Sequence, residues 1–424
     1  MIVCMVGAGV IIGLWRGALV QAELSPYKNL IGHAVKIHGV ATEDPEIDKK
    51  GLKVIRLRVA SIDGHVMSGQ LWVTLSEKNE VKRSDSLVVK GVVEEGFGGF
   101  AAAMYRAKLL SVQRSVPGDV AGEVRDWFAK QVKKILPSEE AALGIGFLTG
   151  QNQTLSPELA DAMKTAGLTH IVVASGYNLT ILVRLTRRVF ARISKYLAAA
   201  SGAIMIGGFM AITGLSPSMS RAGLVAGLSL LAWYYGRKFH PLVLLPFAAA
   251  VTLLLTPSYG WNDLGWQLSF AAFAGVMVVA PLLQAYFFGN KKPGILRQIL
   301  GETIAAQLMT LPILIGAFGQ FSNVALLANI LVVPLVPLAM LVTFLAGMMI
   351  IVWPWLAVII GHLAEVILRY MISVTQALAG LPWAMTEIAV PGYVCVGLYG
   401  VIIGLSGYMW WATKCQLSSA NLVE

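Results

Sequence analysis

The stretch Gly167–Lys195, GLTHIVVASGYNLTILVRLTRRVFARISK, carries the strongest structural signal in the chain. It begins as an apolar run, is interrupted at Ser175-Gly176-Tyr177-Asn178, resumes, and then meets a basic cluster with no acid (Arg184, Arg187, Arg188, Arg192 and Lys195). Apolar segments that end on Lys/Arg clusters are typical of membrane crossings whose basic end is cytoplasmic. A polar break at membrane depth is tolerated only where protein buries it or water lines it. The stretch therefore predicts an orientation and an internal polar path.

The composition is that of a multi-pass membrane protein. Of the 424 residues, 56% are hydrophobic and 13% are charged, whereas roughly 25% of a soluble protein is charged. The net charge of +10 leaves two explanations open: Lys/Arg-rich cytoplasmic loops alone, or affinity for a polyanion. The cysteines Cys4, Cys395 and Cys415 are scattered and offer neither metal-ligand spacing nor a disulfide framework.

Apolar runs predict an all-α polytopic membrane bundle with about nine or ten crossings, some of them broken or re-entrant. Residues 1–20 form the first expected crossing. The basic groups Arg237-Lys238 and Lys291-Lys292 fall on alternate loops, so they share the cytoplasmic side with Arg184–Lys195. The same alternation puts residues 21–116 outside the cytoplasmic membrane. The later expected crossings are Tyr196–Thr213, Ala222–Tyr235, Pro241–Thr256, Leu264–Phe288, Ile299–Phe318, one or two within Val324–Val352, Trp355–Ala379 and Val390–Trp411.

Residues 21–116 have the pattern of a small all-β domain, since the long apolar runs vanish and charges of both signs appear. Alternation and β-branched content predict five short strands, and the Asp63-Gly64 turn joins the second to the third. Five such strands suggest a partly open barrel of the OB-fold kind. The expected strands are Ala34–Glu43, Lys53–Ile62, Val66–Leu75, Ser86–Glu94 and Ala102–Gln113.

OB-folds often bind single strands of nucleic acid through basic grooves and stacking aromatic rings. The candidate DNA contacts in this domain are Arg56, Arg58, Phe97, Phe100 and Arg106, with Trp72 and Tyr105 also considered. The alternative is that Trp72 and Tyr105 belong to the core and the arginines form an ordinary solvated face.

Residues 117–166 are expected to form amphipathic or interfacial helices. Glu123–Leu136 is amphipathic and suits either a membrane surface or packing against a partner helix. Ser138, followed by Glu139-Glu140, predicts the N-cap of a helix that ends near Thr149. Ser156-Pro157 predicts the start of another helix, which Gly167 stops. Both are short for a crossing and are expected to be shallow or re-entrant.

Polar and ionisable groups at membrane depth are costly and usually functional. For Arg221 two roles stay open, pairing with Asp263 across the bundle or lining a passage for anions. Glu365 and Arg369, four residues apart, are expected to pair with each other. The candidate path residues are His170, Ser175, Gly176, Asn178, Arg184, Ser218, Arg221, Asp263, Gln267, Ser269, Asn329 and Pro334.

The sequence does not favour an enzyme. It has no HxxxH or HExxH metal pair, no GxxxxGK[ST] phosphate loop and no GxSxG nucleophile motif. Ser175 has no base placed beside it by spacing. A membrane-embedded hydrolase would need such a base, and no cofactor is expected.

Four stretches resemble motifs of the ComEC competence protein family, the inner-membrane DNA channels of natural transformation. They are GLTHIVVASGYNL, GLSPSMSRAGL, WNDLGWQLSFAAFAG and NVALLANILVVPLVP, in this order between about Pro137 and Thr343. The predicted β domain also lies where that family has an extracytoplasmic OB-type domain. The four motifs together are specific, although each alone would be weak.

The chain departs from the family pattern in two respects. The family usually has Ser-Gly-Leu-His-Val where this chain has SGYNL, so Asn178 keeps a polar group but not a titratable one. Many members also carry a metallo-β-lactamase-like nuclease domain, whereas no HxHxDH motif occurs up to Glu424. A separate nuclease is therefore expected, unless the system degrades no strand.

The resemblance implies a channel that passes single-stranded DNA into the cytoplasm during natural transformation. Its expected partners are single-stranded DNA, the lipid bilayer, a DNA receptor, a cytoplasmic motor ATPase and a nuclease. Because the sequence has no ATP motif, the driving force would come from that motor or from the proton gradient. The alternative is a secondary transporter for a small anion, which would need a closed central pocket.

The expected domain organisation has five parts. They are a first transmembrane helix (1–20), the OB-like domain (21–116), the interfacial helices (117–166), the multi-pass channel domain (167–412) and a tail (413–424).

Overall fold

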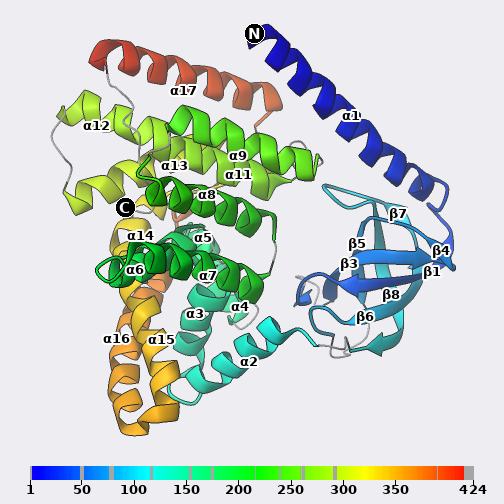
Figure 1. The fold of residues 1–424 in the computed structure, drawn as a ribbon, viewed down its shortest axis with the longest axis horizontal. Helices are drawn as coiled ribbons and strands as arrows, with labels where there is room; N and C mark the ends of the chain where they lie inside the picture. Colours follow the sequence, from blue (N-terminus) through cyan, green and yellow to red (C-terminus); the bar gives the residue numbers. More distant parts are fainter. Residues whose placement is uncertain are drawn as a thin grey trace. The chain divides into compact units, whose positions relative to one another are not determined.

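The computed structural model describes residues 2–47, 52–75, 81–114, 118–151, 155–172, 176–214, 216–237, 240–257, 259, 263–289, 294–388 and 390–414 (Figure 1). The chain divides into two compact units. The first comprises Met1–Val124 with Ala250–Asp263, and the second comprises Arg125–Ala249 with Leu264–Glu424.

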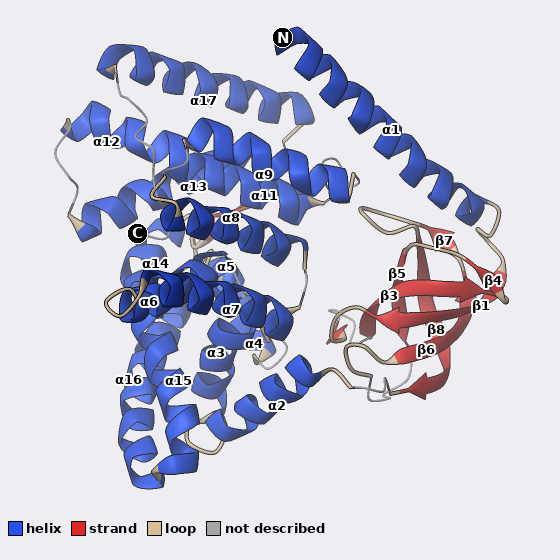
Figure 2. Cartoon of the chain, viewed as in Figure 1, coloured by secondary structure: helices blue, strands red, loops and turns tan. Residues whose placement is uncertain are grey.

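The first unit contains a closed barrel of five main strands (Figure 2). Strand β1 pairs antiparallel with β3 and β6, β6 pairs with β8, and β5 closes the ring between β3 and β8. This confirms the predicted small β domain, with strand ends within a few residues of those expected. The elements are α1 (Ile2–Lys28), β1 (Ala34–Ala41), β2 (Glu46–Ile47), β3 (Lys53–Ile62), β4 (His65–Val66), β5 (Gln70–Leu75), β6 (Ser86–Val92), β7 (Glu94–Glu95) and β8 (Ala102–Gln113).

The third predicted strand, Val66–Leu75, is divided into β4 and β5 at a kink that the end of α1 fills. Gly69 adopts φ +142°, and Tyr27 packs against it. The Tyr27 hydroxyl donates to Ser68 O at 3.0 Å, and its ring lies in the barrel core. Burial raises the pKa of Tyr27 to about 12 because the phenolate would be charged in an apolar site.

Strand β8 contains a bulge that places two successive side chains outside the barrel. The register with β5 shifts between Val73 and Leu75, and Arg106 adopts φ +53°. Its backbone N–H donates to Thr74 Oγ1 at 2.7 Å. Tyr105 and Arg106 are therefore both exposed, and the alternative that placed Tyr105 in the core is wrong.

The second unit is built of helices, with one short two-stranded sheet. The last residues of α9 and the first residues of α2 are assigned to the first unit. The helices from α2 on are α2 (Val120–Val132), α3 (Ser138–Thr149), α4 (Pro157–Thr165), α5 (Thr169–Val172), α6 (Gly176–Phe190), α7 (Lys195–Thr213), α8 (Pro217–Tyr234), α9 (Pro241–Leu255), α11 (Leu264–Ala274), the π-helix η2 (Gly275–Val279), α12 (Ala280–Phe288), α13 (Ile295–Phe318), α14 (Ala325–Val332), the 3₁₀ turn η3 (Val333–Leu335), α15 (Val336–Val352), α16 (Pro354–Ala379) and α17 (Gly392–Thr413); the strands are β9 (Gln320–Ser322) and β10 (Met385–Glu387).

Two helices begin with the same Ser-Pro device. Ser156 Oγ accepts the Leu159 N–H before α4, and Ser216 Oγ accepts the Met219 N–H before α8, both at 3.3 Å. The predicted N-cap at Ser138 is wrong by one residue. Pro137 occupies the cap position of α3 and Ser138 is already helical, without a side-chain capping bond. Pro137 already holds the extended conformation that an N-cap needs.

Helix α2 packs against the hairpin formed by α15 and α16. Phe128 and Val132 are buried, and the Phe128 ring stacks on Phe344 with centroids 6.1 Å apart. Gly347 makes room for this contact, since a Cβ there would clash with both buried side chains. Of the two roles left open for this amphipathic helix, packing against partner helices is the one observed.

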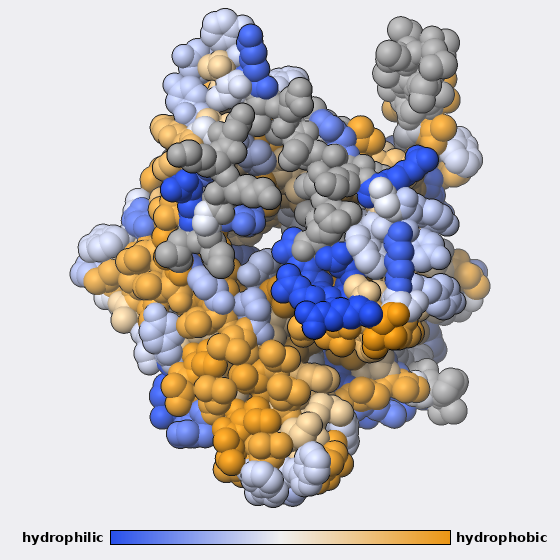
Figure 3. Space-filling view, turned by 60° about the vertical axis from the view of Figure 1, so that its left-hand side comes forward, coloured by the Kyte–Doolittle hydropathy of each residue, from blue (hydrophilic) through white to orange (hydrophobic). Residues whose placement is uncertain are grey.

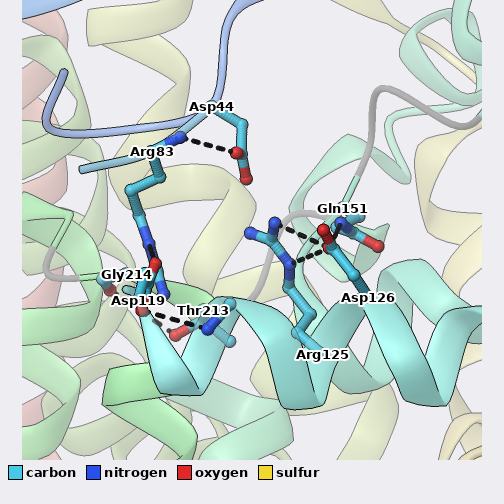
Figure 4. A network of polar contacts seen from close by, with 9 residues as sticks. Asp44, Arg83, Asp119, Arg125, Asp126, Gln151, Thr213 and Gly214 are labelled. Atoms are coloured by element: carbon cyan, nitrogen blue, oxygen red, sulfur yellow. Dashed lines mark hydrogen bonds and ion pairs between the residues drawn. The ribbon is translucent and has the colours of Figure 1, made fainter. Parts of the chain in front are cut away.

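Helix α3 lies deep in the same core, with ten of its twelve residues buried. A Cβ at Gly144 would clash with Thr343 of α15, so the two helices meet at this glycine. The end of α3 is tied to α2 by a polar network (Figure 4). Arg125 Nε and Nη2 donate to Asp126 Oδ1 at 3.0 and 2.9 Å, and Gln151 Nε2 donates to the same oxygen at 3.3 Å.

Among the residues that the structure describes, six helices are long and apolar enough to cross a membrane. They are Lys195–Thr213, Leu264–Phe288, Arg297–Phe318, Ala325–Val352, Pro354–Ala379 and Gly392–Thr413. Each coincides with a predicted crossing, and α1, α8 and α9 occupy the positions of the others. In Figure 3 the surface at the height of α15 and α16 is largely apolar, as expected of a membrane bundle.

Candidate functional site

The described residues of the Gly167–Lys195 stretch are mostly helical, and Gly176, Tyr177 and Asn178 of the predicted break belong to the helix α6. Helix α4 ends before Gly167, which adopts φ +71°; α5 then covers Thr169–Val172, and α6 starts anew at Gly176. Ser175 lies outside the described residues. His170 is exposed on α5, and its Nδ1 lies 3.1 Å from Gly167 O.

Asn178 links α6 to α5 and to α3. Its side chain is fully buried, and Nδ2 donates to Ile171 O on α5 at 3.3 Å and to Phe147 O on α3 at 3.1 Å. Helix ends leave carbonyl groups without partners in the helix. Asn178 therefore satisfies one backbone carbonyl on the short helix α5 and one in the last turn of α3.

The start of α6 touches the start of α8, which carries Arg221. A Cβ on Gly176 would lie 3.1 Å from that of Ala222, so the two helices come close together at this glycine. Arg221 is 3% exposed, and its Nη2 donates to Gly265 O on α11 at 2.9 Å. Its guanidinium also lies 5.6 Å from the centroid of the Phe270 ring. Three of the four family-like motifs thus meet on α6, α8 and α11.

The fourth motif meets the same region at Gly167. A Cβ on Gly167 would clash with Ala325 at the start of α14, and Ser322 Oγ donates to Thr165 O at 2.6 Å. Asn329 is buried on α14, and its Oδ1 has no hydrogen-bond partner among the described residues. Pro334 follows in η3, where the helix tightens before α15.

Four further predicted path residues are half-buried or belong to the other unit. Ser218, Gln267 and Ser269 are half-buried on α8 and α11. Asp263 is assigned to the first unit, so its pairing with Arg221 stays a prediction. Among the described residues, no group of three or more His, Cys, Asp or Glu side chains could hold a metal ion.

The basic end of the stretch is partly fixed by aromatic rings. The Arg187 guanidinium lies 5.0 Å from the centroid of Trp233, and Lys195 Nζ lies 5.7 Å from that of Tyr234. Arg184, Arg188 and Arg192 are exposed beside them. Three arginine side chains are therefore exposed toward one end of α6.

One polar neighbour of the site escaped prediction. Glu302 lies on α13, the helix that packs along α11. Gln298 Nε2 donates to Glu302 Oε1 at 2.8 Å. The signal was available, because Glu302 is a lone acid at the start of a predicted crossing and such residues are usually functional.

A second candidate site lies on the β domain, where Arg56, Arg58, Trp72, Phe97 and Phe100 form an aromatic–basic face. Trp72 packs edge-on against Phe97 and Phe100, with centroids 5.3 and 5.4 Å apart. Arg56 is directly opposite Trp72 in the β3–β5 ladder, and Arg58 is two residues further along β3. Phe97 is 45% exposed, so the cluster offers a ring to a ligand. Trp72 is half-buried.

The charge of this face is mixed. Arg56 is held by Glu43, with Nη1 and Oε2 2.7 Å apart, whereas Arg58 is exposed. Arg106 is exposed at the bulge next to β5. Arg56 and Arg58 thus lie on β3, on one side of the strand that carries Trp72, and Arg106 lies on β8, on the other side of it.

Replacing Asn178 by leucine is expected to lower stability by about 2–4 kcal/mol, since two buried carbonyl groups lose their donor. Thermal unfolding of the detergent-solubilised protein would measure the change. Thr186→Val is the matched control, because Thr186 Oγ1 only caps a carbonyl of its own helix, Leu182 O at 2.7 Å. Equal stability of the two variants would contradict the role given to Asn178.

Comparison with known proteins gives one family and one relative. The family described as Competence protein matches residues 147–413. The chain is 26% identical over 219 residues to ComE operon protein 3 of Bacillus subtilis (strain 168), which is 51% of this chain and 27% of that protein. The chain thus spans about a quarter of the length of that relative. No solved structure matches.

The family match covers α5, α6, α8, α11 and α14. These are the helices that carry the four motifs, and the contacts described above bring them together. The chain belongs to the Competence protein family.

Proposed function

We propose that the protein takes part in DNA uptake by passing a single strand of DNA through the cytoplasmic membrane into the cytoplasm. The observation that carries this proposal is the convergence of the family-like motifs on α6, α8 and α11 around the buried Asn178 and Arg221. A polar break in a membrane helix is tolerated where it lines a path. A buried guanidinium beside such a break suits phosphate groups.

The aromatic–basic face supports the same proposal from the other unit. The bases of a single strand stack on exposed aromatic rings regardless of the nucleotide sequence, and nearby arginines contact its phosphate groups. If residues 21–116 lie outside the membrane, this face would receive the strand before it enters the helical unit. The exposed arginines at the end of α6 would then meet the strand on the cytoplasmic side.

The driving force, DNA capture and strand degradation are expected to come from outside this chain. The sequence has no phosphate-binding ATP motif, so the driving force is expected from a separate motor ATPase or from the proton gradient. Capture of DNA is expected from a receptor, and degradation of the other strand from a separate nuclease. Nothing in the proposed path calls for catalysis by this chain.

The test is entry of labelled DNA into cells that lack the gene, compared with cells in which it has been restored. We expect deletion to leave DNA bound outside and to block its arrival in the cytoplasm, and restoration to reverse the block. Unchanged entry would overturn the proposal. Transport of a small anion, held at the buried Arg221, would then be the function to test.

A further inference from the structure

Helix α16 exposes a row of polar side chains along most of its length, here called the α16 stripe (His362, Glu365, Arg369, Ser373 and Gln376). Its members follow one another three or four residues apart, so they share one side of the helix. The side chains of His362 and Arg369 are 75% and 59% exposed, and Ser373 and Gln376 are exposed as well. From its first to its last member the α16 stripe extends about 21 Å.

The charged members of the α16 stripe form one ladder that ends on a buried carboxylate. His362 Nδ1 lies 3.3 Å from Glu365 Oε2, and Arg369 Nη2 donates to Glu365 Oε1. Arg369 Nε donates to Glu140 Oε1 on α3 at 3.0 Å, and the Glu140 side chain is only 9% exposed. The pairing of Glu365 with Arg369 was predicted, whereas the link to α3 was not. The ladder fixes these groups in place, so the stripe is a built feature of the second unit.

The rest of α16 has the two faces expected of a helix between a core and lipid. Its buried face consists of small and apolar residues that pack on α3, α4, α14 and α15 (Ala357, Gly361, Ala364, Leu368, Met371, Ile372 and Thr375). Its other exposed face is apolar (Trp355, Ile359, Leu363, Val366 and Tyr370). At 100° per residue the α16 stripe lies between these two faces, so it adjoins both the protein core and the surface.

The α16 stripe lies at membrane depth. The adjoining helix α15 is apolar along its whole length, from Val336 to Val352, and exposes Leu338, Leu341 and Phe344. Helix α16 packs along α15 and is itself long and apolar enough to cross a membrane. Lipid cannot solvate a guanidinium, an imidazole and an amide, and such groups in membrane helices face the protein interior or a water-filled cavity.

We propose that the α16 stripe lines a water-filled passage for water and small hydrated ions, which touches the start of α3 at Glu140. The ladder has no excess of basic groups, because its single guanidinium, that of Arg369, stands between two carboxylates. Such a wall offers donors and acceptors to hydrated ions of either sign, and it is poorly suited to a polyanion, which needs an excess of basic groups. The proposal does not depend on what larger molecule the protein transports.

Cysteine accessibility tests the proposal on the full chain in membranes. Cys4, Cys395 and Cys415 are first replaced by serine. Single cysteines then replace three members of the stripe (His362→Cys, Ser373→Cys and Gln376→Cys) and three matched positions on the apolar face (Leu363→Cys, Val366→Cys and Tyr370→Cys). A charged, membrane-impermeant thiol reagent is applied to intact cells and to inverted vesicles.

We expect the three stripe cysteines to react at least about tenfold faster than the apolar three, because the reactive thiolate forms only where water reaches it. Equal, slow reaction at all six positions would overturn the proposal, since lipid or protein would then cover the stripe. Disulfide-linked dimers of the Ser373→Cys or Gln376→Cys variant would also overturn it, since the stripe would then be an interface between copies. The amount of each variant in the membrane shows that the comparison is between inserted proteins.

Discussion

Replacing Arg221 by alanine is expected to abolish DNA uptake while the protein stays in the membrane. The change leaves Gly265 O without the donor at 2.9 Å and removes the cation beside Phe270. Loss of one such hydrogen bond in a buried site costs about 1–3 kcal/mol. That loss weakens the α8–α11 contact but does not by itself unfold a bundle of this size. The function is expected to fail because the guanidinium lies where the motifs of the proposed path meet.

Two measurements test this prediction: the transformation frequency of the cells and the amount of the variant protein in their membrane. Arg221→Lys is expected to recover only part of the uptake, because an ammonium lacks the planar fork of guanidinium. Arg237→Ala is the matched control, since Arg237 is exposed just beyond the end of the same helix. Normal uptake by the Arg221→Ala variant would remove Arg221 from the site.

The double replacement Phe97→Ala with Phe100→Ala is expected to weaken binding of a single-stranded oligonucleotide by about 10- to 100-fold, given about 1–3 kcal/mol per stacked base. Phe97 is exposed and Phe100 is half-buried, and both pack on Trp72 outside the barrel core. Their loss should therefore remove a stacking platform and leave the fold intact. Thermal unfolding of the variant would check that the barrel remains folded.

Fluorescence anisotropy with a labelled thymidine oligomer, on the full chain in detergent, measures the binding. Val66→Ala is the control, because Val66 is an apolar residue of the same domain that is 90% exposed and lies outside the aromatic–basic face. Arg58→Gln should lower the slope of log affinity against log salt by about 0.7. Unchanged affinity in the double variant would show that this face does not bind the strand.

The β domain was largely predictable because each of its strands carries its own signal. In β1 and β3 buried and exposed residues alternate, as the amino-acid pattern indicates. The division of the third strand was not predictable, because it depends on Tyr27, which reaches Gly69 and Ser68 from a distant helix. The bulge at Arg106 likewise depends on a hydrogen bond to another strand.

In the helical unit, the sequence indicates which polar residues to examine but not what they contact. Arg221 and Asn178 were identified because polar groups are rare at membrane depth. Their hydrogen-bond acceptors are the backbone carbonyls of Gly265 and Phe147. Because every residue has a backbone carbonyl, the amino-acid sequence does not indicate which one is the acceptor. The link between Arg369 and Glu140 is hidden for another reason, because 229 residues separate the two in the chain.

The burial of α3 has a consequence for biosynthesis. Gly144 of α3 packs against Thr343 and Leu368, so its partners are made about 200 residues later than α3 itself. At about 5–20 residues per second, that interval is on the order of 10–40 s. Throughout it, α3 must be sheltered by lipid or by the insertion machinery, and its packing is completed only when α15 and α16, in the last third of the chain, have been translated.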